Sequence, residues 1–147
     1  MTTNRGLRAL AAGVLLLTAG CGAEGKDSVG LSGHRYQVEV VTTEEARVRG
    51  LMFVEHMPAD HGMLFVYPDA WPRAFWMKNC RIPLDILYFD AEARFVSAHY
   101  RVPTCHAQAN CPSYPSEGAA RYVLELNAGV GEALGLKPGD VLTLPGR

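Results

Sequence analysis

The sequence has no excess of charge of either sign. Its 147 residues include 14 Lys and Arg and 15 Asp and Glu, which gives a formal net charge of −1. Proteins that bind DNA or RNA usually present a strongly basic face to the phosphates, so we expect no nucleic-acid partner. The apolar fraction of 48% and the charged fraction of 20% are those of an ordinary globular protein. The length suits one domain.

The established short catalytic patterns are also missing. The chain contains no Gly-x-Ser-x-Gly, no His-Glu-x-x-His and no phosphate-cradling glycine loop, and we predict no cofactor. We therefore expect a non-enzymatic module that binds a small ligand or a partner protein. An enzyme that uses a cysteine or the pair Lys78 and Asp85 is kept as an alternative.

The longest apolar run, residues 10–17, is too short to span a membrane comfortably. Arg5 and Arg8 precede it and small residues follow it, which predicts a secretory signal peptide over residues 1–20. The sequence "LTAGC", which ends at Cys21, resembles the bacterial lipoprotein box. The resemblance implies that Cys21 becomes the lipidated first residue. An ordinary signal peptide that leaves Cys21 as a free thiol is the alternative.

The residues after the cysteine predict which membrane holds the protein and how the domain is joined to it. Gly22 follows Cys21, and by resemblance to lipoprotein sorting this implies an extracytoplasmic protein, anchored by lipid in the outer membrane and facing the periplasm. Residues 21–33 are rich in Gly, Ser and charge and show no apolar period, so we predict a flexible tether there. A single globular domain is expected over residues 34–147.

Short strands dominate the expected secondary structure. Alternating apolar residues or short apolar runs bounded by turn residues predict strands over 35–41, 63–67, 73–77, 84–90, 94–102, 121–126 and 141–144. Capping patterns predict helices over 43–52 and 127–136, and a long polar loop is expected over 103–119. The expected fold is α+β: a compact β-barrel-like or strongly bent, mostly antiparallel sheet with two short helices.

Six ordered segments carry a family resemblance, and they read "RGLMF" (49–53), "GMLFVYP" (62–68), "FWMKN" (75–79), "IPLDILYFD" (82–90), "YVLELNAG" (122–129) and "LGLKPGD" (134–140). They resemble the domain of unknown function 192 family, and the likeness spans about residues 35–146. The resemblance implies a small β-barrel-like α+β domain and carries no established reaction. The family more often has Thr after "WMKN", where this chain has Cys80.

The stretch "FWMKN" combines apolar and polar residues in a way that predicts a binding site. In a strand, alternation places Phe75 and Met77 on one face and Trp76 and Lys78 on the other. We predict that Lys78 pairs with Asp85, either as a structural ion pair or within a small-molecule pocket with apolar walls. The candidate ligand-binding residues are Met52, Phe65, Trp76, Lys78, Asn79 and Asp85.

The cysteines favour a disulfide over a metal site. Cys105 and Cys111 lie six apart in a polar segment, and an oxidising compartment favours a disulfide between them. Cys80 is then expected to be a buried, inert thiol. Copper or zinc binding through Met, His and Cys is the alternative, although no recognised ligand spacing occurs. Its candidate ligands are His56, His61, Cys80 and His106.

Overall fold

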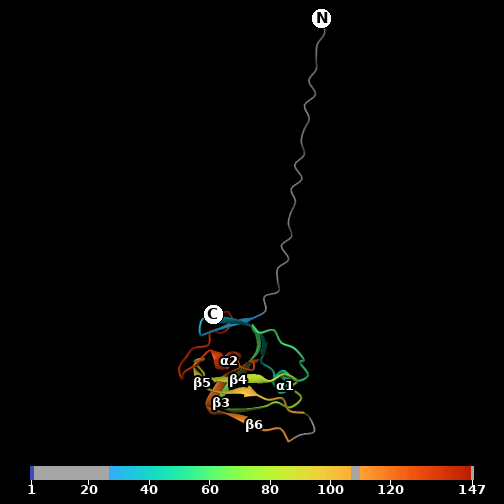
Figure 1. Cartoon of the computed structure of the whole chain (residues 1–147). Helices are drawn as coiled ribbons and strands as arrows, with labels where there is room; N and C mark the ends of the chain where they lie inside the picture. Colours follow the sequence, from blue (N-terminus) through green and yellow to red (C-terminus); the bar gives the residue numbers. More distant parts are fainter. Residues whose placement is uncertain (2–26, 107–109, 147) are drawn as a thin grey trace.

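A single six-stranded sheet organises the protein (Figure 1). The structure is a computed structural model that describes residues 1, 27–106 and 110–146. The strand order across the sheet is β1-β2-β3-β6-β4-β5, and every neighbouring pair is antiparallel except β2 and β3. The strands are β1 (Ser28–Leu31), β2 (His34–Val41), β3 (His61–Trp76), β4 (Leu84–Phe89), β5 (Phe95–Val102) and β6 (Ser113–Asn127). The predicted α+β fold with a bent, mostly antiparallel sheet is confirmed, and the sheet does not close into a barrel.

The folded domain begins earlier than predicted. Residues 28–31 were expected in the tether, but they form β1, which pairs with β2. Val29 and Leu31 are almost completely buried, and burial of these two apolar side chains holds the strand in place despite the neighbouring Gly and Ser. Figure 1 places the C-terminal end of the chain beside β1, where Gly30 forms a bridge with Thr143. The predicted strand over 141–144 is wrong, because only isolated bridges form there.

Two long strands replace several shorter predicted elements. The expected strands 63–67 and 73–77 are parts of one strand, β3, whose pairing with β6 continues past two register irregularities. The predicted loop over 103–119 is wrong in its second half, because β6 already begins at Ser113. The polar composition of this segment and its prolines favoured a loop, but pairing with the end of β3 supplies the backbone hydrogen bonds that extend the strand.

The central strands are buried on both faces. All six residues of β4 are buried, and successive side chains point to opposite sides. Two apolar clusters result, one on each face of the sheet. One contains Phe65, Ile86, Tyr88 and Val123, and the other contains Leu64, Leu87, Phe89 and Leu124.

The helix α1 (Glu44–Arg49) lies where a helix was predicted, but it is shorter. Thr43 caps its N-terminus by accepting a hydrogen bond from the Ala46 amide at 3.2 Å. The helix ends at Gly50, whose φ of 47° is readily adopted only by glycine. The following residues therefore leave the helix and turn towards the sheet, so that Leu51 is buried.

The helix α2 (Val130–Ala133) covers only part of the predicted helix 127–136. Asn127 was expected as its N-cap but is the last residue of β6, and its amide donates to the Met57 carbonyl at 2.8 Å. No helix in the described ranges is both long enough and apolar enough to cross a bilayer.

Candidate functional site

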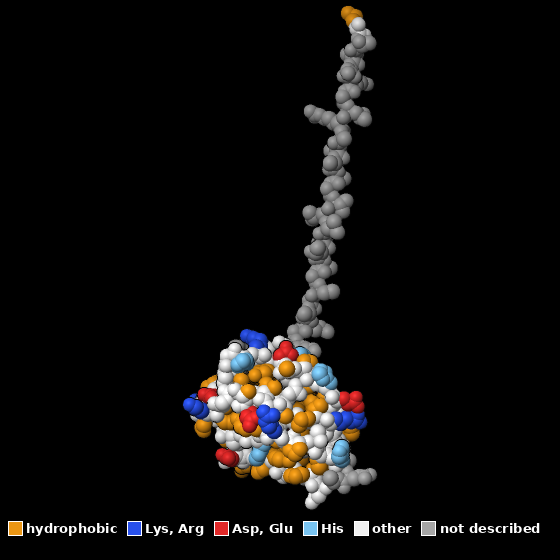
Figure 2. Space-filling view, viewed as in Figure 1, with side chains coloured by type: hydrophobic (Ala, Val, Ile, Leu, Met, Phe, Trp, Pro, Cys, Tyr) orange, Lys and Arg blue, Asp and Glu red, His pale blue; other side chains and the backbone are white. Residues whose placement is uncertain are grey.

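The principal candidate site is a groove between α1 and the second half of β3, which we call the α1–β3 groove. Its volume is about 430 Å³. The residues that shape it are Arg47, Val48, Tyr67, Arg73, Phe75 and Trp76. Figure 2 shows that apolar side chains gather in several patches on the visible face of the domain, between scattered charged side chains.

Two guanidinium groups hold the ring of Tyr67 at one end of the groove. The Cζ atoms of Arg47 and Arg73 lie 4.7 and 3.9 Å from the ring centroid. Arg73 is fixed by Asp69 at 2.6 Å, and Arg47 donates to the Val66 carbonyl at 3.0 Å. Burial raises the pKa of Tyr67, which keeps its hydroxyl protonated. This end of the groove is therefore rigid and rich in hydrogen-bond donors.

The other end of the groove is formed by the "FWMKN" stretch. Phe75 points inward and contacts the rings of Phe65 and Tyr88 edge to face, with centroids 4.9 and 5.9 Å away. Trp76 points outward and is 47% exposed. The Lys78 ammonium lies 5.0 Å from the Trp76 ring centroid, a cation–π distance. The predicted alternation of this strand is therefore present.

A small void adjoins the groove, and we call it the Glu125 void. Its volume is about 30 Å³, enough for one water-sized atom. It shares Arg47, Val48, Phe75 and Trp76 with the α1–β3 groove. Its remaining wall includes Met52, Phe65, Lys78, Cys80 and Glu125.

Glu125 is the most unusual residue of the site. It is only 4% exposed, and its Oε2 is the one buried side-chain oxygen or nitrogen in the described residues that has no hydrogen-bond partner. Burial raises the pKa of Glu125 to about 8, because the low-dielectric core disfavours the charged form. Burial, with a further contribution from Glu125, raises the pKa of Cys80 to about 12 and raises the pKa of Tyr88. At neutral pH the side chain of Glu125 is therefore mostly a neutral acid.

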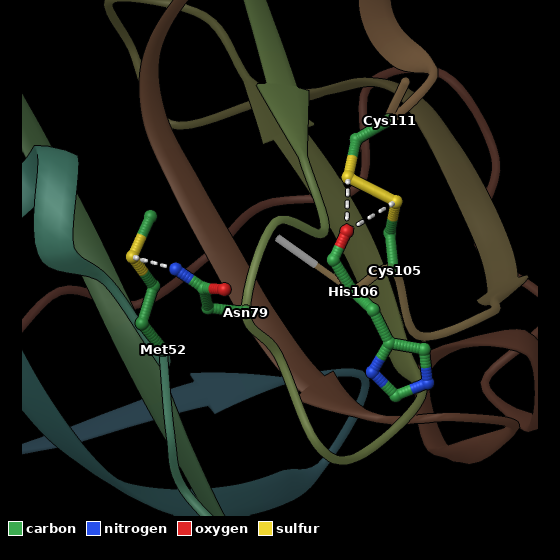
Figure 3. Close-up of a disulfide and its surroundings, with 5 residues drawn as sticks. All are labelled: Met52, Asn79, Cys105, His106 and Cys111. Atoms are coloured by element: carbon green, nitrogen blue, oxygen red, sulfur yellow. Dashed lines mark hydrogen bonds between the residues drawn. A yellow bond between two sulfur atoms is a disulfide. The ribbon is translucent and has the colours of Figure 1, made fainter. Parts of the chain in front are cut away.

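Four of the six predicted ligand-binding residues meet at this void. Met52, Phe65, Trp76 and Lys78 line it together. Asn79 instead borders a neighbouring hollow of about 170 Å³ with Phe53, Cys80, Arg81 and His106. Figure 3 shows the Asn79 amide directed at the Met52 thioether, and the two atoms are 4.0 Å apart.

The predicted pair of Lys78 and Asp85 does not form. Asp85 is completely buried beside α2, on the opposite face of the sheet from Glu125. Its Oδ1 accepts hydrogen bonds from the Arg101 and Gly129 amides, and its Oδ2 accepts one from the Glu132 amide. These backbone donors satisfy the carboxylate, so Asp85 supports the β4–α2 packing and not the groove.

Glu125 and the two arginines of the groove were missed in the sequence analysis. A signal for Glu125 exists, because it is a single acid within the apolar run 122–126. Glu125 shares a strand face with Val123. Once both faces of the strand are known to be covered, an acid at this position is expected to be buried. Arg47 carried no comparable signal, because helix arginines are usually solvated.

The disulfide between Cys105 and Cys111 is confirmed, and the free Cys80 is buried as predicted. In Figure 3 the His106 carbonyl oxygen lies near both disulfide sulfurs, at 3.8 and 3.7 Å, and the imidazole points away from them. His61 is engaged by Asp60 at 2.8 Å. No three His, Cys, Asp or Glu side chains within the described ranges are grouped to hold a metal, so His56, His61, Cys80 and His106 form no such cluster.

The model of the domain of unknown function 192 family, described as "Uncharacterized ACR", matches residues 27–144. The chain belongs to this family. The resemblance stated from the six sequence segments is therefore confirmed. Among curated proteins, none matches the chain.

Two crystal structures of bacterial proteins resemble the domain. A protein of Sinorhizobium meliloti 1021, which its name proposes to be a transcription regulator, is 37% identical, with a TM-score of 0.71 over 79% of this chain and 91% of that chain. A protein of unknown function from Novosphingobium aromaticivorans DSM 12444 is 31% identical, with a TM-score of 0.70 over 78% of this chain and 82% of that chain. Membership of the domain of unknown function 192 family therefore accounts for the fold and leaves the function to be inferred from the site.

Proposed function

We propose that this protein is a lipid-anchored extracytoplasmic module that binds a small ligand in the α1–β3 groove. The observation that carries the proposal is the unpartnered, buried oxygen of Glu125 at the base of a void that adjoins this groove. Small-molecule sites combine apolar walls with a few convergent polar groups, and the groove and void together offer Trp76, Phe75, Lys78 and Glu125. The regulator name of the Sinorhizobium protein is not carried over, because the net charge of −1 is unsuited to DNA.

The anchor part of the proposal rests on the lipoprotein-like sequence that ends at Cys21, which lies outside the described residues. The first strand begins at Ser28, so residues 22–27 are the link between the proposed lipid and the sheet. Such a link spans at most about 20 Å when fully extended. A lipid on Cys21 would therefore hold the domain close to the membrane surface, and the predicted tether of residues 21–33 is correspondingly too long.

Replacing Cys21 with serine is expected to move the protein from the membrane fraction of a bacterial host to its soluble periplasmic fraction. Serine offers no thiol for lipid attachment, so labelling with a radioactive fatty acid is expected to disappear as well. The variant Cys80→Ser is the control, because Cys80 lies inside the domain and its loss leaves the proposed anchor intact. Fatty-acid labelling that persists in Cys21→Ser would show that no lipid is attached at Cys21.

Replacing Trp76 with alanine is expected to abolish small-ligand binding, because the substitution removes the exposed aromatic wall of the groove. Two measurements test this on residues 22–147: native mass spectrometry for a copurified compound, and saturation-transfer NMR with the neutral probe 2-naphthamide. Trp71→Ala is the matched control, since Trp71 is 63% exposed and does not line the groove. Absence of any retained compound, together with no saturation transfer from the wild-type protein to 2-naphthamide, would contradict the proposed binding function.

A further inference from the structure

We infer that the ligand of the α1–β3 groove is a small carboxylate with an apolar body, and that Glu125 donates a hydrogen bond to one of its carboxylate oxygens while Lys78 balances its charge. This inference rests on the proposed function and adds the chemical class of the ligand. Three features of the site lead to it: the balance of charge around the groove, the state of Glu125, and the size of the void.

The walls of the groove and the void carry an excess of positive charge, although the chain as a whole has a net charge of −1. Arg73 is neutralised by Asp69. Within the described part of the chain, the remaining cations Arg47, Arg49 and Lys78 are in no ion pair with a carboxylate. Besides Asp69, which pairs with Arg73, the groove is lined by one further acid, Glu44. The local field therefore favours an anion.

The protonation state of Glu125 indicates which kind of anion binds. As a neutral acid it has an O–H donor that requires an acceptor, and a buried donor without a partner is unfavourable by about 1–3 kcal/mol. A carboxylate oxygen is a strong acceptor, and a hydrogen bond between an acid and a carboxylate is charge-assisted. A cationic ligand could also pair with Glu125, but it would have to enter past Lys78, Arg47 and Arg49.

The volumes of the void and the groove indicate where the two parts of such a ligand lie. The Glu125 void, about 30 Å³, admits a single oxygen-sized group. The groove, about 430 Å³, admits the rest of a small organic molecule. Val48, Phe75 and Trp76 border both spaces, so an apolar body packed against them places its carboxylate at the entrance of the void.

Binding of a carboxylate is then linked to the protonation of Glu125. Its titratable neighbours from the other elements are Tyr67 on β3, Tyr88 on β4 and Cys80 after β3, and all three stay neutral up to pH 9 because burial raises their pKa values. Glu125 is therefore the group near the void that changes charge between pH 7 and 9.

The test is calorimetric titration of the protein with 2-naphthoate and with its neutral analogue 2-naphthamide, at pH 7 and pH 9. The naphthoate carboxyl, with a pKa near 4, is ionised at both values. The dissociation constant of naphthoate is expected to rise about tenfold from pH 7 to pH 9, because most of the protein has then lost the proton of Glu125. At pH 9, titrations in two buffers of different ionisation enthalpy are expected to show uptake of about one proton per naphthoate bound.

Two variants make the test specific. Glu125→Gln keeps a donor and a neutral side chain, so it is expected to bind naphthoate with less than a twofold change between pH 7 and pH 9 and no proton uptake. Glu117→Gln is the matched control on the same strand, because Glu117 is exposed, and it is expected to behave as the wild type. Lys78→Gln is expected to weaken naphthoate about tenfold and to leave naphthamide unchanged.

The outcomes separate this inference from the proposed function. If naphthamide binds as tightly as naphthoate with no dependence on pH, the carboxylate inference is wrong and the groove remains a small-ligand site. If the pH dependence persists in Glu125→Gln, another group takes up the proton and the inference is overturned. If naphthoate does not bind the folded wild-type protein at millimolar concentration and naphthamide does not bind either, both the inference and the proposed use of the groove fail.

Discussion

Asp85→Ala is expected to lower the free energy of unfolding by about 4 kcal/mol. The Asp85 carboxylate is fully buried and accepts from the backbone amides of Arg101, Gly129 and Glu132 at 2.7, 2.9 and 2.9 Å. Alanine leaves these three part-buried donors without their partner, and such loss is unfavourable by about 1–3 kcal/mol for each donor when it is buried. Urea unfolding followed by circular dichroism measures the change.

Two controls distinguish this structural role from the ion pair expected from the sequence. Asp90 also accepts from two backbone amides, of Glu92 and Arg94, but at the surface, so Asp90→Ala is expected to lower stability by only about 1 kcal/mol. A double-mutant cycle of Asp85→Ala with Lys78→Ala is expected to show no coupling, since the two side chains are apart. A coupling energy above about 1 kcal/mol, or a near-neutral Asp85→Ala, would contradict the structural account.

Glu125→Gln is expected to stabilise the protein increasingly as the pH rises from 5 to 8. In the wild type, the pKa of Glu125 is raised from 4.5 in the unfolded chain to about 8 in the fold. Between these values the folded protein holds a proton that the unfolded chain has released, so wild-type stability falls with rising pH by about 1 kcal/mol per pH unit and levels off above pH 8. Glutamine does not titrate, so its stability lacks this decline, and the advantage of the variant reaches several kcal/mol.

Urea unfolding of both proteins at pH 5, 6.5 and 8 tests this expectation. The quantity of interest is the difference in unfolding free energy between Glu125→Gln and wild type, because other groups titrate equally in the two proteins. The same difference for Glu117→Gln, at an exposed position of β6, is expected to stay constant within about 0.5 kcal/mol. A constant difference for Glu125→Gln as well would show that the carboxyl is not held neutral by the fold.

Asp85 and Glu125 lie on the paired strands β4 and β6, and yet they have opposite effects on the stability of the fold. Asp85 and Leu126 are cross-strand partners, and Glu125 precedes Leu126 in β6. The Asp85 carboxylate is satisfied by three amides and stabilises the fold, whereas the Glu125 carboxyl has an oxygen without a partner and lowers stability at neutral pH. Polar groups that violate the rules of burial are expected at functional sites, which is why Glu125, and not Asp85, is the centre of the proposed site.

Much of the local structure followed from the sequence. The alternation of "FWMKN" correctly predicted that Phe75 and Trp76 lie on opposite faces, and the spacing of Cys105 and Cys111 correctly predicted their disulfide. Four of the six proposed ligand-binding residues line one void. These are properties of a single strand or a short segment, where the period of two residues decides which side chains share a face.

The tertiary structure alone decided which polar groups meet. β6 lies between β3 and β4 although it is the last strand in sequence, and this insertion buries Glu125 at the void that Trp76 also lines. Asp85 is only seven residues from Lys78, and proximity in sequence favoured pairing the two. The fold instead brings the amides of Gly129 and Glu132 to Asp85 from more than forty residues away. Local pattern determines the side of a strand, but long-range strand order determines what lies against that side, and the second cannot be read from a single stretch of sequence.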